Sequence, residues 1–138
     1  MRQVTGTIAV ETQGQGFTDV TRRIAGWLDG TGLEEGLLTV FIRHTSASLL
    51  IQENADPDVL ADLGDALDRL APRNAGWRHD TEGPDDMPAH IRASLTQTHL
   101  SIPLVGGRLM LGTWQGIYVV EHRDRPQRRE LALHLMGQ

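Results

Sequence analysis

The segment HDTEGPDDMPAH, which runs from His79 to His90, places two histidines and four acidic residues within twelve positions. Histidine and carboxylate side chains bind divalent transition metals and exchange protons. The segment also contains two prolines and a glycine, so it cannot form one regular element. The spacing of the two histidines matches no helical metal motif, and taken alone both could be surface residues. If a helix begins near Pro88, its free N–H groups would favour a phosphate there.

His44 is a second candidate, at the end of the strand-like segment TVFIRH. It shares a strand face with Val40 and Ile42, so it should emerge from a buried face where the strand ends. The simplest interpretation is a histidine at the edge of the core that bonds a backbone group. The hydroxyl residues of HTSAS, Ser46 among them, could instead orient the imidazole as a ligand or base. Ser46 is also a candidate contact for a substrate phosphate.

The polar residues of QENADP form a third group, directly after the next strand-like segment. Asp56 precedes a proline and a helical pattern, so it is first of all a candidate helix cap. Asn54 suits a turn and is also a candidate substrate contact. Glu53 has no such structural role, and we expect it to act as a general base or as a partner of a histidine.

A fourth group lies in GRLMLGTWQGIYVVEHR, where two glycines indicate a close-packed bend between strands. Trp114 in this bend could simply fill the core. Thr113 and Gln115 would then offer polar groups at the mouth of a pocket, an arrangement that is typical of small-ligand sites. Arg108 and His122, at the two ends of the segment, are further candidate contacts for an anionic ligand.

The composition restricts the possible functions. The chain has 138 residues, of which 39% are hydrophobic, and this predicts one domain spanning residues 1–138. The net charge of −5 argues against non-specific binding to nucleic acid, which requires a basic face. No cysteine is present, so any metal must bind His, Asp, Glu or water. We see neither a signal peptide nor an apolar run of membrane-spanning length, and we expect a cytoplasmic protein without membrane contact.

Hydrophobic periodicity predicts the strands and helices of the chain. Glycine, proline and acidic residues mark their ends. The expected order is a strand over 3–12, a helix through Val20 and Leu28, strands on either side of HTSAS, a helix over 57–70, a short helix from Pro88, a hairpin turning at Gly106 and Gly107, and strands over 116–123 and 128–136. These elements predict an α+β fold in which a distorted, mainly antiparallel β-sheet packs against two to three helices.

Three blocks of this sequence together resemble a known family. HTSASLLIQENADPDV, HDTEGPDDMPAHIRASL and GRLMLGTWQGIYVVEHR are similar, in this order, to the motifs of the YjbQ or UPF0047 family of small bacterial and archaeal proteins. The resemblance covers nearly the whole chain and implies the family's α+β fold and its assembly as a homotrimer. Carried over by motif, the family's histidine-and-acid cluster falls on His44, Glu53, Asp56, His79 and His90.

The resemblance also implies an activity. Members have been linked to a secondary thiamine-phosphate synthase activity, a transfer that joins a pyrimidine-methyl diphosphate to a thiazole phosphate and releases pyrophosphate. The alternative is a non-enzymatic module that binds a metal or a phosphorylated metabolite. We predict that His44, His79 and His90 converge on one metal site, either in one chain or at a subunit interface, with His44, Glu53 and Asp56 as catalytic residues. In a third interpretation the histidines are only packing groups of the trimer interface. Three histidines favour zinc, whereas magnesium is the more usual partner of a diphosphate substrate.

Overall fold

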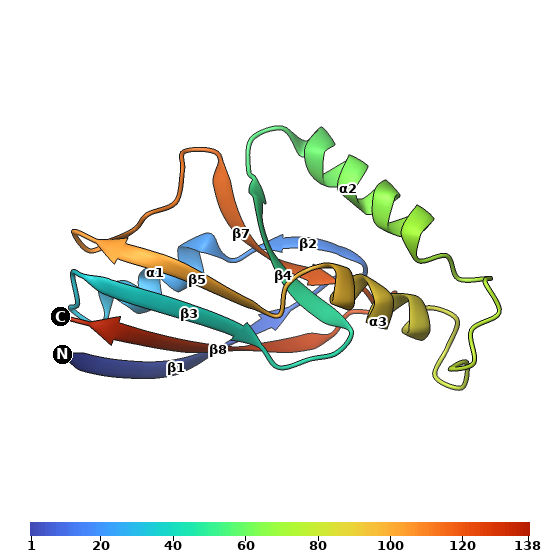
Figure 1. Cartoon of the computed structure of the whole chain (residues 1–138), viewed down its shortest axis with the longest axis horizontal. Coiled ribbons are helices and arrows are strands. Elements are labelled where there is room, and N and C mark those ends of the chain that lie inside the picture. The colour runs from blue at the N-terminus through green and yellow to red at the C-terminus, as the bar shows by residue number, and fades with distance from the viewer.

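The computed structural model describes all residues, 1–138, as two antiparallel sheets and three helices (Figure 1). The five-stranded sheet has the order β1-β8-β3-β5-β6, and the three-stranded sheet has the order β2-β7-β4. The strands are β1 (Arg2–Glu11), β2 (Gly16–Asp19), β3 (Gly36–Ile42), β4 (Ala47–Glu53), β5 (His99–Val105), β6 (Arg108–Leu109), β7 (Gln115–Glu121) and β8 (Arg128–Gly137). The helices are α1 (Thr21–Asp29), α2 (Pro57–Leu70) and α3 (Asp86–Leu95).

The last strand, β8, lies within the five-stranded sheet and pairs with both β1 and β3. Its side chains alternate, so that Leu131, Leu133 and Leu135 are buried while their neighbours face outward. These leucines belong to a core that also includes residues of β3, β4, β5, β7 and α1. The predicted α+β class and its mainly antiparallel sheet are therefore confirmed.

Local chemistry accounts for the ends of two predicted elements. Asp56 caps α2 by accepting a 2.9 Å hydrogen bond from the backbone N–H of Asp58, and Pro57 is the first helical residue. Gly106 and Gly107 form the turn between β5 and β6 with φ angles of +60° and +76°. Only glycine adopts such angles without strain, which is why this dipeptide makes the hairpin.

Some expectations about local structure were wrong. No strand was predicted between the strand over 3–12 and the helix through Val20, but residues 16–19 form β2 on the edge of the three-stranded sheet. Helix α1 begins after Val20, and the carboxylate of Asp19 accepts a 2.9 Å hydrogen bond from the backbone N–H of Thr21. Trp114 does not fill the core, because 63% of its surface is exposed.

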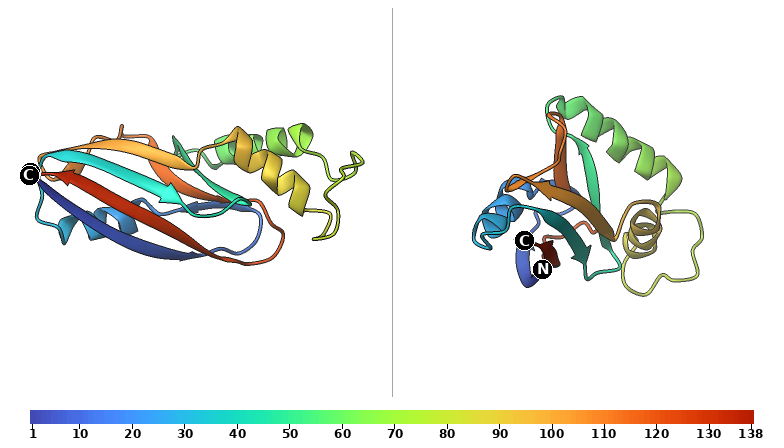
Figure 2. Two further views of the ribbon diagram at one scale, coloured as in Figure 1. Left: turned by 60° about the horizontal axis from the view of Figure 1, so that its bottom comes forward. Right: turned by 60° about the vertical axis from the view of Figure 1, so that its left-hand side comes forward.

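Helices α2 and α3 gather at one end of the molecule, and both chain termini lie at the opposite end (Figures 1 and 2). No residue of α2 is buried, although its apolar side chains repeat with helical periodicity. Helix α3 is packed more deeply, with Asp86 and Arg92 among its buried residues. None of the helices is long and apolar enough to cross a membrane.

Candidate metal centre

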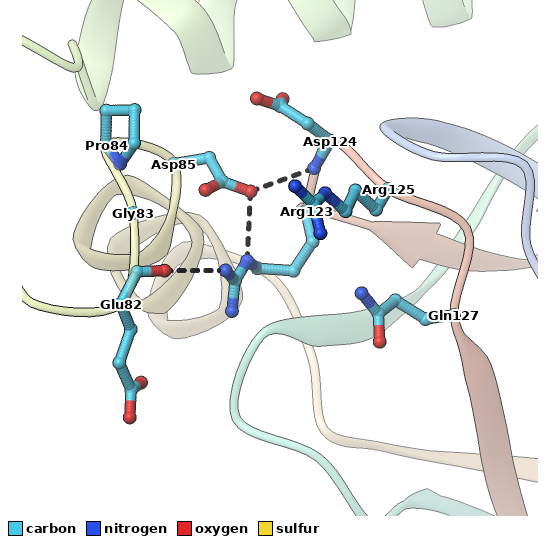
Figure 3. A pocket seen from close by; sticks show the side chains of 8 residues that line it. All are labelled: Glu82, Gly83, Pro84, Asp85, Arg123, Asp124, Arg125 and Gln127. Atoms are coloured by element: carbon cyan, nitrogen blue, oxygen red, sulfur yellow. Dashed lines mark hydrogen bonds and ion pairs between the residues drawn. The ribbon is translucent and has the colours of Figure 1, made fainter.

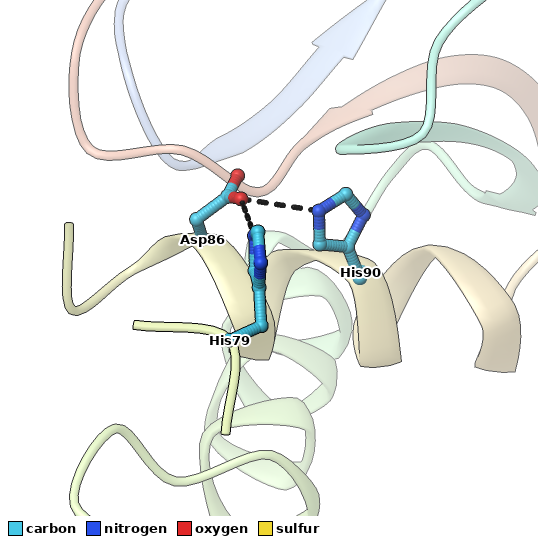
Figure 4. Close-up of side chains that lie close together, drawn as sticks. All are labelled: His79, Asp86 and His90. Carbon is cyan, nitrogen blue, oxygen red and sulfur yellow. Dashed lines mark hydrogen bonds and ion pairs between the residues drawn. The ribbon is translucent and has the colours of Figure 1, made fainter. Parts of the chain in front are cut away.

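Helix α3 and the loop before it bring His79, Asp86 and His90 together (Figure 4). Asp86 is the first residue of α3, and His90 follows one turn later on the same face. The Nε2 atoms of His79 and His90 lie 2.6 Å and 3.1 Å from the same oxygen of Asp86, Oδ2. The two imidazole rings meet edge to face, with their centres 5.4 Å apart. One potential ligand atom from each side chain lies within 4.8 Å of the others.

The protonation of His90 follows from its second contact. Its Nδ1 atom lies 3.0 Å from the carbonyl oxygen of Thr45, and a carbonyl can only accept, so Nδ1 carries a hydrogen. In a neutral ring, Nε2 then holds a lone pair that points at a carboxylate oxygen. The Nε2 lone pair and the carboxylate oxygen repel each other at 3.1 Å unless a positively charged species lies between them. That species is either a second proton on His90 or a bound cation.

Asp86 is held as a buried anion, with only 3% of its side chain exposed. Its other oxygen, Oδ1, accepts a 2.7 Å hydrogen bond from Nη1 of Arg123. Burial acts to raise the pKa of Asp86, but the hydrogen bond from His79 and the charge of Arg123 help to hold this pKa below its usual value. The carboxylate is therefore ionised at neutral pH, as a metal ligand must be.

Arg123 fixes the loop that carries this site (Figure 3). Its Nε atom donates to Asp85 at 2.9 Å, and its Nη2 atom donates to the carbonyl of Glu82 at 2.9 Å. Asp85 also accepts from the backbone N–H of Asp124. Asp85 thus stands at the cap position of α3, yet its carboxylate binds the β7–β8 loop instead of the helix. These residues line a polar pocket of about 440 Å³ beside the centre.

The donor set fits zinc or a similar transition metal. Two imidazole nitrogens and one carboxylate oxygen are ligands that zinc accepts, and catalytic zinc sites commonly use three protein ligands and leave a further position open. The carbonyl of Thr45 accepts from His90, and the guanidinium of Arg123 donates to Asp86. Each thus orients one candidate ligand, as the outer partners of metal ligands usually do. Magnesium fits less well because it prefers oxygen ligands.

The ring of His44 does not join this centre within the chain. Its Nε2 atom accepts a 2.9 Å hydrogen bond from the backbone N–H of Glu130, and its Nδ1 atom lies 3.4 Å from Nη1 of Arg129. Burial, followed by the charge of Arg129, lowers the pKa of His44. A lone pair already in use and a neighbouring guanidinium both oppose metal binding. Within one chain, therefore, two histidines meet Asp86, and His44 does not join them.

Glu53, Asn54 and Asp56 lie at the far end of β4 from His44. Because a strand rises about 3.3 Å per residue, β4 alone separates the two groups by about 20 Å. Glu53 accepts from the backbone N–H of Asp56, and Asp56 in turn caps α2. Their carboxylates thus have local structural partners, and the structure does not bring them to the histidines. The expected single cluster of all five family-implied residues is not present in the chain.

The other predicted substrate contacts are also dispersed. Asn54 donates to the carbonyl of Gln115, and the side chain of Gln115 accepts from the N–H of Gly112, so both stabilise the loop before β7. Thr113 lies in this loop, and Arg108 begins β6. Thus none of these four residues is among the side chains that form the centre.

His122 and Ser46 lie deeper in the chain than expected. His122 is buried, and its Nε2 atom lies 2.8 Å from the hydroxyl of Ser48. Burial and the nearby charge of Arg92 help to lower the pKa of His122 to about 4, so its ring is neutral. The hydroxyl of Ser46 accepts a 3.0 Å hydrogen bond from Arg129. His122 is thus a structural residue of the interior, whereas Ser46 lies beside His44.

Asp86 was not among the predicted metal ligands, because the helix was expected to begin only at Pro88. The structure begins α3 at Asp86, which places its carboxylate one helical turn before His90. Arg123 was not among the predicted site residues. Its contact with Asp86 joins residues 37 positions apart, which no local pattern reveals.

The comparisons with known proteins agree with the fold and the motifs. The family described as UPF0047 protein YjbQ-like matches residues 6–138. The chain is 51% identical to a UPF0047 protein of Synechocystis, over 99% of this chain and 94% of that protein. It is 43% identical to the UPF0047 protein YjbQ of Salmonella typhimurium, over 96% of both.

Solved structures give the same result. A member of the YjbQ/UPF0047 family from Clostridium acetobutylicum is 37% identical and superposes with a TM-score of 0.87, over 94% of this chain and 98% of that one. A protein from Aeropyrum pernix is 33% identical, with a TM-score of 0.88 over 98% and 99% of the two chains. From its motifs, its fold and these relatives, the chain belongs to the YjbQ/UPF0047 family.

Proposed function

We propose that this protein binds a divalent transition metal, zinc in the first place, through His79, Asp86 and His90, and acts on a small phosphorylated metabolite. The observation that carries the proposal is the contact between His90 and Asp86. The Thr45 carbonyl fixes the hydrogen of His90 on Nδ1, so its Nε2 lone pair faces an ionised carboxylate at 3.1 Å. Either a second proton on His90 or a metal cation satisfies both groups, and the cation is the alternative that metal analysis tests.

A metal held there would supply Lewis acidity and neutralise charge on a phosphoryl group. The chain's own residues supply the remaining requirements. The Arg123 guanidinium and the Thr45 carbonyl hold two of the three ligands in place, which reduces the cost of ordering them. Asp86 brings a negative charge to a buried position, so a dication is favoured there over an anion.

The specific reaction that we propose is a thiamine-phosphate synthase-like transfer, in which a pyrimidine-methyl diphosphate loses pyrophosphate as it joins a thiazole phosphate. Such a site must stabilise the departing pyrophosphate, and a metal ion with nearby arginines is a common means of doing so. The support for this reaction is the family resemblance together with the candidate metal centre. If the protein instead only binds a metal or a phosphometabolite, no saturable turnover will be seen with this substrate pair.

We further propose that the protein assembles as a homotrimer, as the resemblance implies. The five-stranded sheet supports self-association because its outer face carries large apolar side chains. Leu37, Phe41, Val105 and Met136 are each between 44% and 46% exposed. Light scattering of the purified protein should give three times the mass of the 15.2 kDa chain, and Phe41→Glu should shift it toward the monomer.

The metal proposal is tested by metal analysis of the untagged protein. We expect about one zinc or similar ion per chain, and its loss in His90→Ala and Asp86→Asn. His99→Ala is the matched control, because His99 is an exposed histidine outside the centre, and this variant should keep the metal. The proposal fails if the wild type takes up no metal after incubation with zinc and removal of the excess. It also fails if all three variants keep the metal.

Activity is tested separately from metal content. Pyrophosphate release from the pyrimidine diphosphate and the thiazole phosphate should saturate at micromolar to millimolar substrate and be lost with the metal. A metal-loaded protein without saturable turnover would contradict the transferase proposal and leave the metal centre in place.

A further inference from the structure

His44, in the loop between β3 and β4, and Arg129, in β8, hold two hydrogen-bond donors that face each other without an acceptor. The backbone N–H of Glu130 donates to Nε2 of His44 at 2.9 Å, and a backbone N–H cannot accept. Nε2 therefore carries the lone pair, and the hydrogen of the neutral ring is on Nδ1. That Nδ1–H lies 3.4 Å from Nη1 of Arg129, which is also a donor. The pair is therefore not a hydrogen bond.

Arg129 cannot turn away from this position. It is buried, with 6% of its side chain exposed, and its other nitrogens are engaged. Nε and Nη2 donate to the two oxygens of Glu121 at 2.8 Å and 2.5 Å, and Nη2 also donates to the carbonyl and hydroxyl of Ser46. Nη1 contacts only the ring of His44. The ion pair of the buried guanidinium with Glu121 therefore holds Nη1 of Arg129 beside a second hydrogen-bond donor, Nδ1 of His44.

The two donors open onto a pocket of about 550 Å³ that is lined without any carboxylate. Its lining includes the hydroxyl residues Thr45, Ser46 and Thr98 and a second arginine, Arg43. Arg43 pairs with Glu130 and Arg129 pairs with Glu121, so the pocket has little excess charge. Its selectivity must come from oriented donors, which suits a ligand with several acceptor atoms and no donor.

We propose that this pocket binds an oxyanion, such as the phosphate group of a small metabolite, between Nδ1 of His44 and Nη1 of Arg129. One oxygen placed there accepts from both donors, and the neighbouring hydroxyls can serve the remaining oxygens. The site requires no metal and goes beyond the function proposed above. Thr45 nevertheless belongs to both, because it lines the pocket while its carbonyl accepts from His90. Thr45 would therefore separate a phosphate bound in this pocket from His90 of the candidate metal centre.

The tautomer of His44 can be measured in the unaltered protein by long-range ¹H–¹⁵N correlation of the imidazole nitrogens. The protein is first treated with a chelator, so that no bound metal contributes. We expect the hydrogen on Nδ1, and a saturable shift of the His44 nitrogens and of the Thr45 and Ser46 amides on titration with inorganic phosphate. Acetate titrated in parallel distinguishes a carboxylate site from a phosphate site. Saturable binding of either anion supports the proposal.

His44→Ala is the variant that tests the contact, and His134→Ala is its control, because His134 bonds Gln3 and does not line the pocket. Loss of a hydrogen bond to a charged ligand should weaken phosphate binding by about tenfold or more in His44→Ala and leave it unchanged in the control. The proposal is overturned if His44 carries its hydrogen on Nε2, or if neither anion shifts the loop. A phosphate response that appears only after zinc is restored, and is lost in His90→Ala, would also overturn it by assigning the anion to the metal centre.

Discussion

Replacing Glu121 with glutamine should lower the free energy of unfolding by about 3–5 kcal/mol, the range seen when one partner of a buried ion pair is removed. Glu121 has no exposed side-chain surface, and its partner Arg129 is 6% exposed. Oε1 accepts from Thr12 and from Nε of Arg129, while Oε2 accepts from Nη2 of Arg129 and from the backbone N–H of Arg123. The carboxylate therefore satisfies four donors from three parts of the chain.

Glutamine has nearly the same shape but replaces one of these oxygens with an NH₂ group. In either orientation of the amide, that NH₂ faces two donors, and the guanidinium of Arg129 loses its counter-charge. A hydrogen bond to a charged group contributes about 1.5–3 kcal/mol, so two lost contacts account for about 3 kcal/mol or more. This sum agrees with the range for a broken buried pair.

Urea denaturation followed by circular dichroism, at one fixed chain concentration and pH 7, measures the change. Glu130→Gln is the matched control, because the pair of Glu130 with Arg43 is exposed, with side-chain exposures of 44% and 61%. We expect that control to lose less than about 1 kcal/mol. A loss of the same small size in Glu121→Gln would refute the reasoning, since the buried carboxylate would then contribute no more than an exposed one.

The same pair predicts a pH dependence. Burial acts to raise the pKa of Glu121, but the hydrogen bonds from Arg129 and Thr12 contribute to a net lowering. A carboxyl whose pKa is lower in the folded state contributes its full stability above the unfolded pKa of about 4.3 and loses it as the pH falls through the folded value. The stability difference between the wild type and Glu121→Gln should therefore shrink in acid, below about pH 4.

Three further changes are predicted. The pKa of His122 is lowered to about 4 in the folded protein, so the unfolded chain binds more protons between about pH 6.5 and pH 4. The melting temperature should therefore fall as the pH falls through this window, and it should depend less on pH in His122→Gln. Gly64→Ala should raise the free energy of unfolding by about 0.5–1 kcal/mol, because Gly64 lies inside α2 with open space at its Cβ position, and a lower melting temperature would contradict this. Gly6→Ala should lower it by about 1–3 kcal/mol, because the added Cβ would clash with the indole of Trp27, and unchanged denaturation would show that the indole moves freely.

Much of the fold could be predicted from the sequence because its signals are local. The helix over 57–70 and its cap Asp56 follow from one proline, one aspartate and the spacing of leucines. The hairpin at Gly106 and Gly107 follows from backbone angles that other residues avoid. Strand β2 escaped prediction because it is four residues long and begins at a glycine, so its pairing with β7 determines it more than its own pattern does.

The sequence by itself determined the family, the α+β class and the importance of the segment from His79 to His90, since each is written in contiguous residues. Only the tertiary structure decided which side chains meet. In the structure Asp86, and not His44, lies beside the two histidines, and Arg123 contacts Asp86 although it is 37 positions away in the sequence. The tertiary structure also turned His44 toward Arg129, 85 positions away. Such pairings depend on how β3, β8 and α3 pack in space, and the spacing of residues along the chain carries no record of that packing.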